Sequence, residues 1–230
     1  CAIIRSHYST LDGTALAFEG YQYWRQWADH LGVDDERGLA RFEEVGCAIM
    51  KTPLNGHMAS ICANLDALGI AWEDWDNETL SKRLPIYDLH SYAPAKLPDD
   101  PGFGEATGPS MHGAIFTPQA GYISDPQLAT HNVQVAAEAA GGKFRFNCDV
   151  IAIRQMNGRA CGITLANGDE IDAAVVVNVA GPHSSKVNEL AGVAESMTIK
   201  TRALRQEVVH LPSPDGFDYM THGPVTSDSD

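Results

Sequence analysis

Apolar residues recur along the chain with two different periods, and these periods predict where helices and strands form. Between residues 14 and 31 they return every three or four positions, which is typical of an amphipathic helix, and Gly32 is placed to end it. The aromatic residues of this segment are expected to pack into a core rather than to stack on a ligand. Further helices are expected at residues 55–68, 77–84, 125–140 and 183–190.

Strand-like segments with short turns between them predict a β-meander over residues 149–172. Asn157-Gly158 and Asn167-Gly168 favour tight turns because Asn and Gly tolerate positive φ angles. Other strands are expected at residues 45–50, 114–116, 143–147 and 198–211. Helices and strands thus alternate along the chain, which predicts an α/β or α+β fold.

One segment, residues 174–179, is apolar at nearly every position. It reads Ala-Val-Val-Val-Asn-Val, which indicates a strand buried on both faces, as in a parallel sheet. Ala180 and Gly181 follow it, and a predicted helix comes next. In open α/β sheets, ligands bind beyond the carboxyl ends of the strands, where a glycine lets the backbone approach a cofactor. A simple tight turn at Gly181 accounts for the pattern equally well.

A glycine-rich stretch at residues 102–108 superficially resembles a nucleotide-binding loop. Such a loop must follow a buried strand and open a helix, so that the helix N-terminus can hold the phosphates. Here the preceding residues read Leu-Pro-Asp-Asp-Pro, and the glycine spacing is GxGxxxG. We therefore expect residues 92–109 to form a long surface loop that does not bind a dinucleotide.

Composition and charge exclude several classes of function. The 230 residues carry a formal net charge of -14, which repels phosphates and argues against nucleic-acid binding. The five cysteines are scattered without a CxxC pair, so we expect reduced thiols, a cytoplasmic location and no metal site. A membrane span is not expected, because no run of about 18 apolar residues occurs. The chain begins at Cys1 within structured sequence, and we expect it to be a piece of a longer protein.

Several motifs in the same order carry a family resemblance. Residues 113–126 read GAIFTPQAGYISDP, and AEAAGGKF, VIAI and NGRACGITLANGDEIDAAVVVNVAGPHS follow. Near the start, residues 3–8 read IIRSHY. Together these motifs resemble those of the FAD-dependent oxidoreductases of the D-amino-acid oxidase, glycine oxidase and sarcosine oxidase family. In that family a GxGxxG segment binds much of the FAD, and it would precede residue 1.

The resemblance implies a two-domain architecture, of which this chain holds part. One domain is a Rossmann-like FAD-binding domain with a β-meander, and the other is an antiparallel-sheet substrate domain. By resemblance, residues 1–39 and 124–196 belong to the FAD-binding domain. Residues 40–123 and 197–230 belong to the substrate domain.

The implied activity is oxidation of the C–N bond of a small amino acid or N-methyl amino acid, such as glycine, sarcosine or dimethylglycine. The partners would be a small amine substrate and either dioxygen or an electron carrier, within an oligomer or a hetero-complex. Two alternatives stay open. The same fold could oxidise a 2-hydroxy acid or a polyol phosphate, or the chain could belong to a non-catalytic FAD-binding subunit of an oxidase.

The resemblance also implies site residues. In the sarcosine-oxidising relatives, an arginine that matches Arg5 pairs with the substrate carboxylate, and a guanidinium suits that task because its planar fork matches two oxygens. His7 and Tyr8 lie beside it and either contact the substrate or pack. No residue stands out as a catalytic acid or base.

The predicted cofactor contacts come from two parts of the chain. Cys1 and Ala2 match residues near the flavin ring, Val150 matches a position whose backbone meets the adenine, and Ala180 with Gly181 match the flavin-proximal turn. For Arg5 a structural role, and for Val150 an ordinary strand position, are the competing interpretations.

Overall fold

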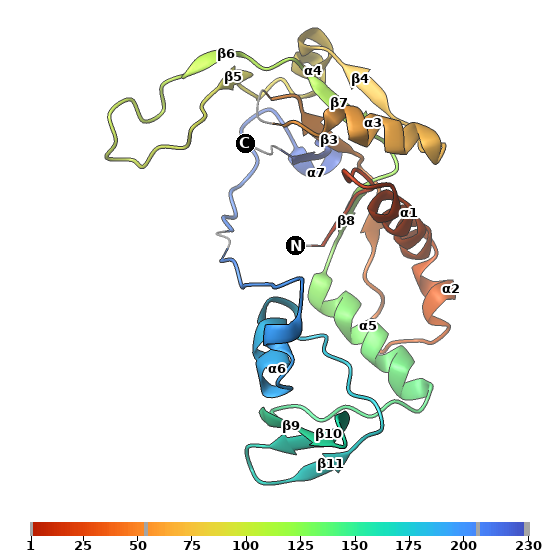
Figure 1. Cartoon of the computed structure of the whole chain (residues 1–230). Coiled ribbons are helices and arrows are strands. Elements are labelled where there is room, and N and C mark those ends of the chain that lie inside the picture. Colours follow the sequence, from red (N-terminus) through yellow and green to blue (C-terminus); the bar gives the residue numbers. More distant parts are fainter. Residues whose placement is uncertain (1, 53–54, 206–207, 228–230) are drawn as a thin grey trace. The chain divides into compact units, whose positions relative to one another are not determined.

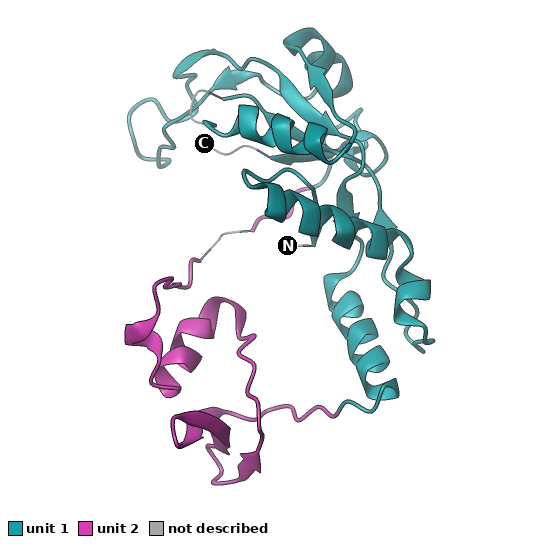
Figure 2. Ribbon diagram, turned by 45° about the vertical axis from the view of Figure 1, so that its right-hand side comes forward, with its two compact units in different colours: residues 1–142, 212–230 teal, residues 143–211 magenta. Residues whose placement is uncertain are grey.

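A computed structural model describes residues 2–52, 55–205 and 208–227. The chain forms two compact units, which Figure 2 distinguishes by colour. Unit 1 comprises residues 1–142 and 212–230, and unit 2 comprises residues 143–211. Helices combine with antiparallel and mixed sheets, in agreement with the predicted α/β or α+β class.

The central sheet of unit 1 has the strand order β12-β3-β7-β4, and Figure 1 labels β3, β7 and β4. Strand β3 (Cys47–Met50) pairs antiparallel with β7 (Ala114–Thr117), which in turn pairs antiparallel with β4 (Glu73–Trp75). Strand β12 (Val225–Ser227) joins β3 in parallel. All four residues of β3 are buried, because both faces of the sheet are covered. The predicted strands at 45–50 and 114–116 are confirmed.

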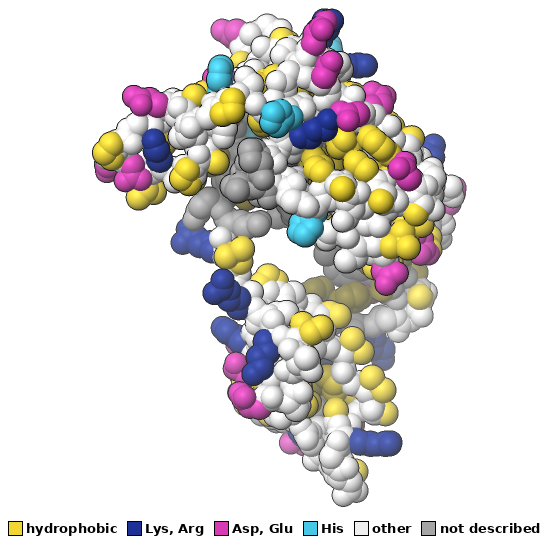
Figure 3. All heavy atoms as spheres, turned by 45° about the horizontal axis from the view of Figure 1, so that its top comes forward, with side chains coloured by type: hydrophobic (Ala, Val, Ile, Leu, Met, Phe, Trp, Pro, Cys, Tyr) yellow, Lys and Arg dark blue, Asp and Glu magenta, His cyan; other side chains and the backbone are white. Residues whose placement is uncertain are grey.

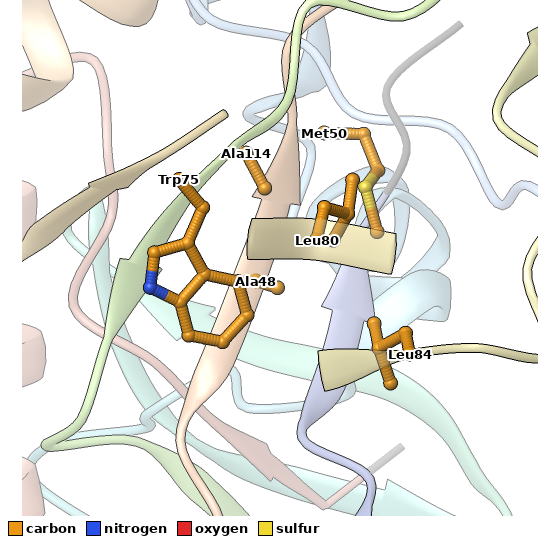
Figure 4. Close-up of a cluster of buried hydrophobic side chains, with 6 residues drawn as sticks. All are labelled: Ala48, Met50, Trp75, Leu80, Leu84 and Ala114. Carbon is orange, nitrogen blue, oxygen red and sulfur yellow. The ribbon is translucent and has the colours of Figure 1, made fainter. Parts of the chain in front are cut away.

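Alternate residues of β3 enter two different hydrophobic clusters. Ala48 and Met50 pack with Trp75, Leu80, Leu84 and Ala114, as Figure 4 shows. Helix α4 (Asn77–Arg83), capped by Asp76, supplies this face. On the other face Ile49 packs against helix α3 (Met58–Ala67). The period of two along a strand thus places two cores on opposite faces of one sheet.

The first predicted helix forms, but as two pieces. Helix α1 (Leu11–Arg25) begins three residues earlier than expected because the Thr10 side chain caps it, and α2 (Trp27–Leu31) ends at Gly32 with φ +64°. Tyr21 and Trp27 are buried, and the Trp24 and Trp27 rings stack with centroids 4.1 Å apart. The expectation that these aromatic residues form core is therefore confirmed for Tyr21 and Trp27, whereas Tyr23 is exposed.

A second sheet of unit 1 has the order β1-β8-β2. Strands β1 (Ile3–Ile4) and β2 (Phe42–Glu43) both pair antiparallel with β8 (Gly121–Ile123). Helix α5 (Pro126–Ala139) follows, with the Asp125 side chain at its N-terminus and Pro126 in its first turn, as the sequence indicates.

The predicted long loop lies within residues 90–110, which we call the β5–β6 arm. Strands β5 (His90–Ser91) and β6 (Gly108–Ser110) form a two-stranded ladder, and the glycine-rich stretch lies in the connection between them. No described strand leads into residues 102–108 and no described helix follows them directly, so the strand–loop–helix arrangement of a dinucleotide loop is not seen among the described residues there. A short helix, α7 (Tyr219–His222), precedes β12.

Unit 2 contains the predicted meander, with order β11-β10-β9. Strands β9 (Val150–Met156), β10 (Arg159–Leu165) and β11 (Glu170–Asp172) agree with the expected bounds. Asn157 and Gly158 have φ angles of +53° and +75°, as the predicted tight turn requires. The short helices η1 (Gly181–His183), α6 (Ser184–Leu190) and η2 (Ala194–Ser196) follow.

Three predicted strands are wrong for this structure. Residues 143–147, 174–179 and the described part of 198–211 are not strands, and residues 206–207 lie outside the described residues. Val177 is 73% exposed and Phe146 is 63% exposed. An apolar run becomes a strand only when a neighbour supplies its ladder hydrogen bonds, and no described strand pairs with these segments.

Candidate functional site

The segment that follows β1 brings Arg5, His7 and Tyr8 together. The Nη1 atom of Arg5 donates a hydrogen bond to the Nε2 atom of His7, and the two atoms are 2.8 Å apart. The Arg5 guanidinium also lies over the Tyr8 ring, 5.3 Å from its centroid. Arg5 is partly exposed and makes no ion pair with any described residue. The three predicted substrate residues thus form one cluster around a guanidinium that lacks a carboxylate partner in the described chain.

His7 is the most deeply buried member, with 5% of its surface exposed. Burial, with the nearby positive charge of Arg5, lowers the pKa of His7 to about 3, so its imidazole is neutral at ordinary pH. Its Nδ1 atom and the Oγ atom of buried Ser6 have no hydrogen-bond partner in the described structure. These two polar atoms can therefore still accept or donate a hydrogen bond.

The backbone of this segment is held by two helices. The Thr14 hydroxyl of α1 donates to the Tyr8 carbonyl oxygen at 3.2 Å, and the Asn64 side chain of α3 donates to the same oxygen at 3.1 Å. Thr14 is fully buried. Cys47, at the start of β3, is also influenced by Arg5: burial raises the pKa of this thiol to about 12, and the guanidinium acts weakly in the opposite sense. The cluster consequently sits on a fixed base beside the central sheet.

The predicted cofactor residues divide between the two units. Cys1 lies outside the described residues, whereas Ala2 in unit 1 adopts φ +39° and its carbonyl oxygen accepts a hydrogen bond from the Ile123 N–H. A non-glycine residue in this region carries backbone strain. In unit 2, Val150 begins β9 and is 36% exposed.

Ala180 and Gly181 form an exposed turn in unit 2 that leads into α6. Gly181 has φ +55°, and no heavy atom lies within 4 Å of the place a Cβ would take. The Asn178 side chain holds the turn, since its oxygen accepts from the Ala180 N–H and its Nδ2 atom donates to the Ser184 carbonyl. The backbone at Gly181 is therefore open to close approach.

Unit 1 also contains a pocket that sequence reasoning missed. Its volume is about 980 Å³, and it lies between the β3 end, the β5–β6 arm and Thr226 of β12. Arg5, His7 and Tyr8 do not line it. The pocket and the Arg5 cluster are therefore separate features of unit 1.

Members of two hydrogen-bonded groups line the pocket, namely Asp88, His90 and Tyr92 of one and Tyr87 and Thr226 of the other. Asp88 accepts from Nδ1 of His90 at 2.6 Å and from the Tyr92 hydroxyl at 2.5 Å, and these bonds, with one from the His90 backbone, lower the pKa of Asp88 to about 2. The Tyr87 hydroxyl shares hydrogen bonds with those of Tyr219 and Thr226. The spacing of two between Asp88, His90 and Tyr92 was the available signal, because it places side chains on one side of an extended segment.

The fold and the motifs define a class, the FAD-dependent oxidoreductases, and comparison with known proteins agrees with this class. The model of the family described as DAO, FAD dependent oxidoreductase, matches residues 1–230. The chain therefore belongs to this family, and the family predicted from the motifs is confirmed. A search of curated proteins gave no match.

Solved structures with a similar fold include L-proline dehydrogenase from P. horikoshii, with 17% identity, a TM-score of 0.61, and coverage of 84% of this chain and 45% of that chain. Glycine oxidase from Geobacillus kaustophilus has 16% identity, a TM-score of 0.56, and coverage of 84% and 47%. Glycine oxidase from Bacillus cereus ATCC 14579 has 19% identity, a TM-score of 0.53, and coverage of 82% and 46%. The chain thus spans less than half the length of these structures.

FAD is the cofactor of this family, and the residues present fit it. In unit 2, Gly181 offers an open backbone and Val150 begins a strand whose first residue is accessible. In unit 1, the unpartnered polar atoms of Ser6 and His7 adjoin β1.

Other site types find less support in the described chain. Among its residues, no three His, Cys, Asp or Glu side chains are grouped so that they could hold a metal ion. The described cysteines, Cys47, Cys62, Cys148 and Cys161, are free thiols. Within the same residues no helix has the length and apolar character to cross a membrane. Both signs of charge occur on the face drawn in Figure 3.

Proposed function

We propose that this protein oxidises the C–N bond of a small amino acid or N-methyl amino acid, with Arg5 holding the substrate carboxylate. The observation that carries the proposal is the Arg5 guanidinium, which is supported by His7 and Tyr8 but lacks a carboxylate partner among the described residues. A buried or half-buried guanidinium without a counter-charge favours an anionic ligand. A carboxylate suits it in both charge and geometry.

The chain's own residues bind and orient the substrate. Arg5 has five N–H donors, of which one is used by His7, so the others are available for two carboxylate oxygens. A carboxylate fixed in this way presents the adjacent carbon, which carries the nitrogen, in one orientation. The neutral imidazole of His7 adds no positive charge that would compete for the carboxylate.

For the cofactor, we propose contacts at Cys1, Ala2, Val150, Ala180 and Gly181. Bound there, FAD would supply the two-electron oxidation of the C–N bond, with the carbon next to nitrogen as hydride donor, water to hydrolyse the imine product, and dioxygen or a carrier as the final electron acceptor. We further propose that residues 1–39 and 124–196 serve the cofactor and residues 40–123 and 197–230 serve the substrate.

Anaerobic bleaching of the flavin tests this function in the complete protein that contains this chain. Sarcosine, dimethylglycine, glycine, proline and a D-amino acid are added one at a time, with 2-hydroxyglutarate as the hydroxy-acid comparison. We expect bleaching by at least one amino acid and a loss of that reaction in Arg5→Ala. The matched control is Arg41→Ala, which removes an exposed arginine whose ion pair among the described residues is with Glu43, and this variant is expected to react normally.

Other outcomes overturn the proposal in different ways. Bleaching by the hydroxy acid alone would move the substrate to that class. A yellow protein that no compound bleaches would favour a non-catalytic subunit. A reaction that survives in Arg5→Ala would remove Arg5 from the carboxylate site.

A further inference from the structure

His7 is the one member of the Arg5 cluster that is too deeply buried to be a surface contact. Only 5% of its surface is exposed, and its neighbour Ser6 is fully buried. Its ring nonetheless reaches a charged group, because Nε2 lies 2.8 Å from Nη1 of Arg5. A buried imidazole beside a guanidinium needs an explanation, since burial disfavours both charges and unsatisfied polar atoms.

The chemistry of Arg5 and His7 determines which atom donates and which accepts in their hydrogen bond. Arginine remains protonated in proteins and has only donors, so Arg5 donates and His7 Nε2 accepts. The imidazole proton must then lie on Nδ1. A second proton would remove the acceptor and set two cations against each other at contact distance. His7 is thus committed to one tautomer and to the neutral form.

The surroundings make this arrangement rigid. The Tyr8 ring lies against the guanidinium, and the Tyr8 carbonyl is fixed from both sides by Thr14 and Asn64. The segment therefore has two helices as its base, and His7 acts from a defined position.

We propose that His7 is a positioning residue, whose neutral ring aims the Arg5 guanidinium so that its remaining N–H groups face an incoming carboxylate. His7 itself does not touch the substrate. This positioning role differs from the two roles that the sequence left open for His7, which were substrate contact and packing. It rests on the proposed function, because it requires that Arg5 binds a carboxylate.

The test measures carboxylate binding in the complete flavoprotein, with acetate as the probe and acetamide as its uncharged control, followed by the flavin absorption spectrum. His7→Leu places an apolar side chain at this buried position and removes the acceptor, and we expect acetate binding to weaken by about tenfold, in line with the loss of a hydrogen bond to a charged group. His7→Gln places an amide oxygen near the position of Nε2 and should recover most of that loss. Acetamide binding and the flavin content should stay unchanged in both variants.

A double-mutant cycle separates positioning from general damage. In an Arg5→Ala background, His7→Leu should cause no further loss of acetate binding, because its partner is gone. Nitrogen-15 NMR of labelled histidine gives a readout independent of binding: the His7 signal, assigned by its absence in His7→Gln, should report a proton on Nδ1 only.

The outcomes distinguish a failure of the proposed function from a failure of the positioning role of His7. If Arg5→Ala leaves acetate binding unchanged, the proposed function fails at this residue. If Arg5→Ala weakens binding but His7→Leu does not, only the positioning role is wrong. A His7 ring protonated at Nε2, or a His7→Gln variant as weak as His7→Leu, would also refute it. Should His7→Leu fail to fold, the NMR result on the unaltered protein decides.

Discussion

Apolar segments are buried in unit 1 but are mostly exposed in unit 2. Unit 1 contains three hydrophobic clusters built from segments far apart in the chain. In unit 2, Leu165 is the only buried hydrophobic side chain among the described residues, while Val175, Val177 and Val179 are exposed. The elements of unit 2 that do form are a meander with tight turns and short helices. Local turn chemistry is therefore sufficient for a hairpin, whereas a buried strand requires neighbours.

The largest expected effect comes from truncating the core of unit 1. Leu80 is fully buried in the cluster of Figure 4, so Leu80→Ala should lower the free energy of unfolding by about 3 to 4 kcal/mol. Val177→Ala in unit 2 is the matched change at an exposed valine, with less than about 0.5 kcal/mol expected. Urea unfolding measures both. If Val177→Ala lowered the free energy of unfolding by more than about 1 kcal/mol, Val177 would be buried, as the strand predicted from the sequence requires.

The buried polar network of unit 1 comes next. Asn132 of α5 is fully buried, accepts hydrogen bonds from the Ala40 N–H and the Trp27 indole, and donates to Asp35 and to the Gly38 carbonyl. Asn132→Ala leaves these buried partners without their hydrogen bonds, so we expect the free energy of unfolding, measured with urea, to decrease by about 2 to 3 kcal/mol. Val133→Ala, half-exposed on the same helix, should change stability by less than about 0.5 kcal/mol. Equal losses at both positions would mean that the helix, rather than the network, sets the cost.

Acid should weaken unit 1 through His7. Burial lowers the pKa of His7 in the folded protein from the ordinary histidine value of 6.5 to about 3, so the unfolded chain binds the proton first as the pH falls. The contribution of neutral His7 to the free energy of unfolding is therefore fully present above pH 6.5 and decreases between pH 6.5 and 3. At about 1.4 kcal/mol per pH unit, the free energy of unfolding should fall by roughly 2 kcal/mol from pH 7 to pH 5. Thermal unfolding over this range measures it. His7→Gln should flatten the profile, whereas His210→Gln at an exposed site of unit 2 should leave it in place. A profile that survives in His7→Gln contradicts the assignment.

The smallest effect distinguishes two glycines. Gly158 in the β9–β10 turn has φ +75°, and Gly158→Ala should destabilise the hairpin by about 1 kcal/mol. Gly20 lies inside α1 with open space around it, and Gly20→Ala should stabilise that helix by about 0.5 to 1 kcal/mol. Amide hydrogen exchange of each element reports both changes. Destabilisation at both sites would contradict the distinction drawn between turn and helix.

The candidate site was partly predictable. The IIRSHY segment marked Arg5, His7 and Tyr8 as neighbours in sequence, and the structure brings their side chains together. That Arg5 bonds to His7 rather than to an acidic residue could not be predicted, because it depends on burial and on how α1 and α3 hold the backbone. The pocket at the β5–β6 arm escaped notice because its lining comes from β3, the arm and β12, which are distant in sequence.

By itself, the sequence determined the family, the capped helices, the tight turns and the meander. The caps and turns depend on residues that are near in the chain, such as a side chain that caps its own helix or a glycine that accepts positive φ. The family is recognised from sequence motifs alone. The tertiary structure alone decided which apolar runs are buried. Residues 45–50 became the centre of a sheet, while residues 174–179 did not become a strand, although both segments are apolar. The difference is physical: a strand gains its hydrogen bonds and its burial from neighbours, and only the first segment has them among the described residues.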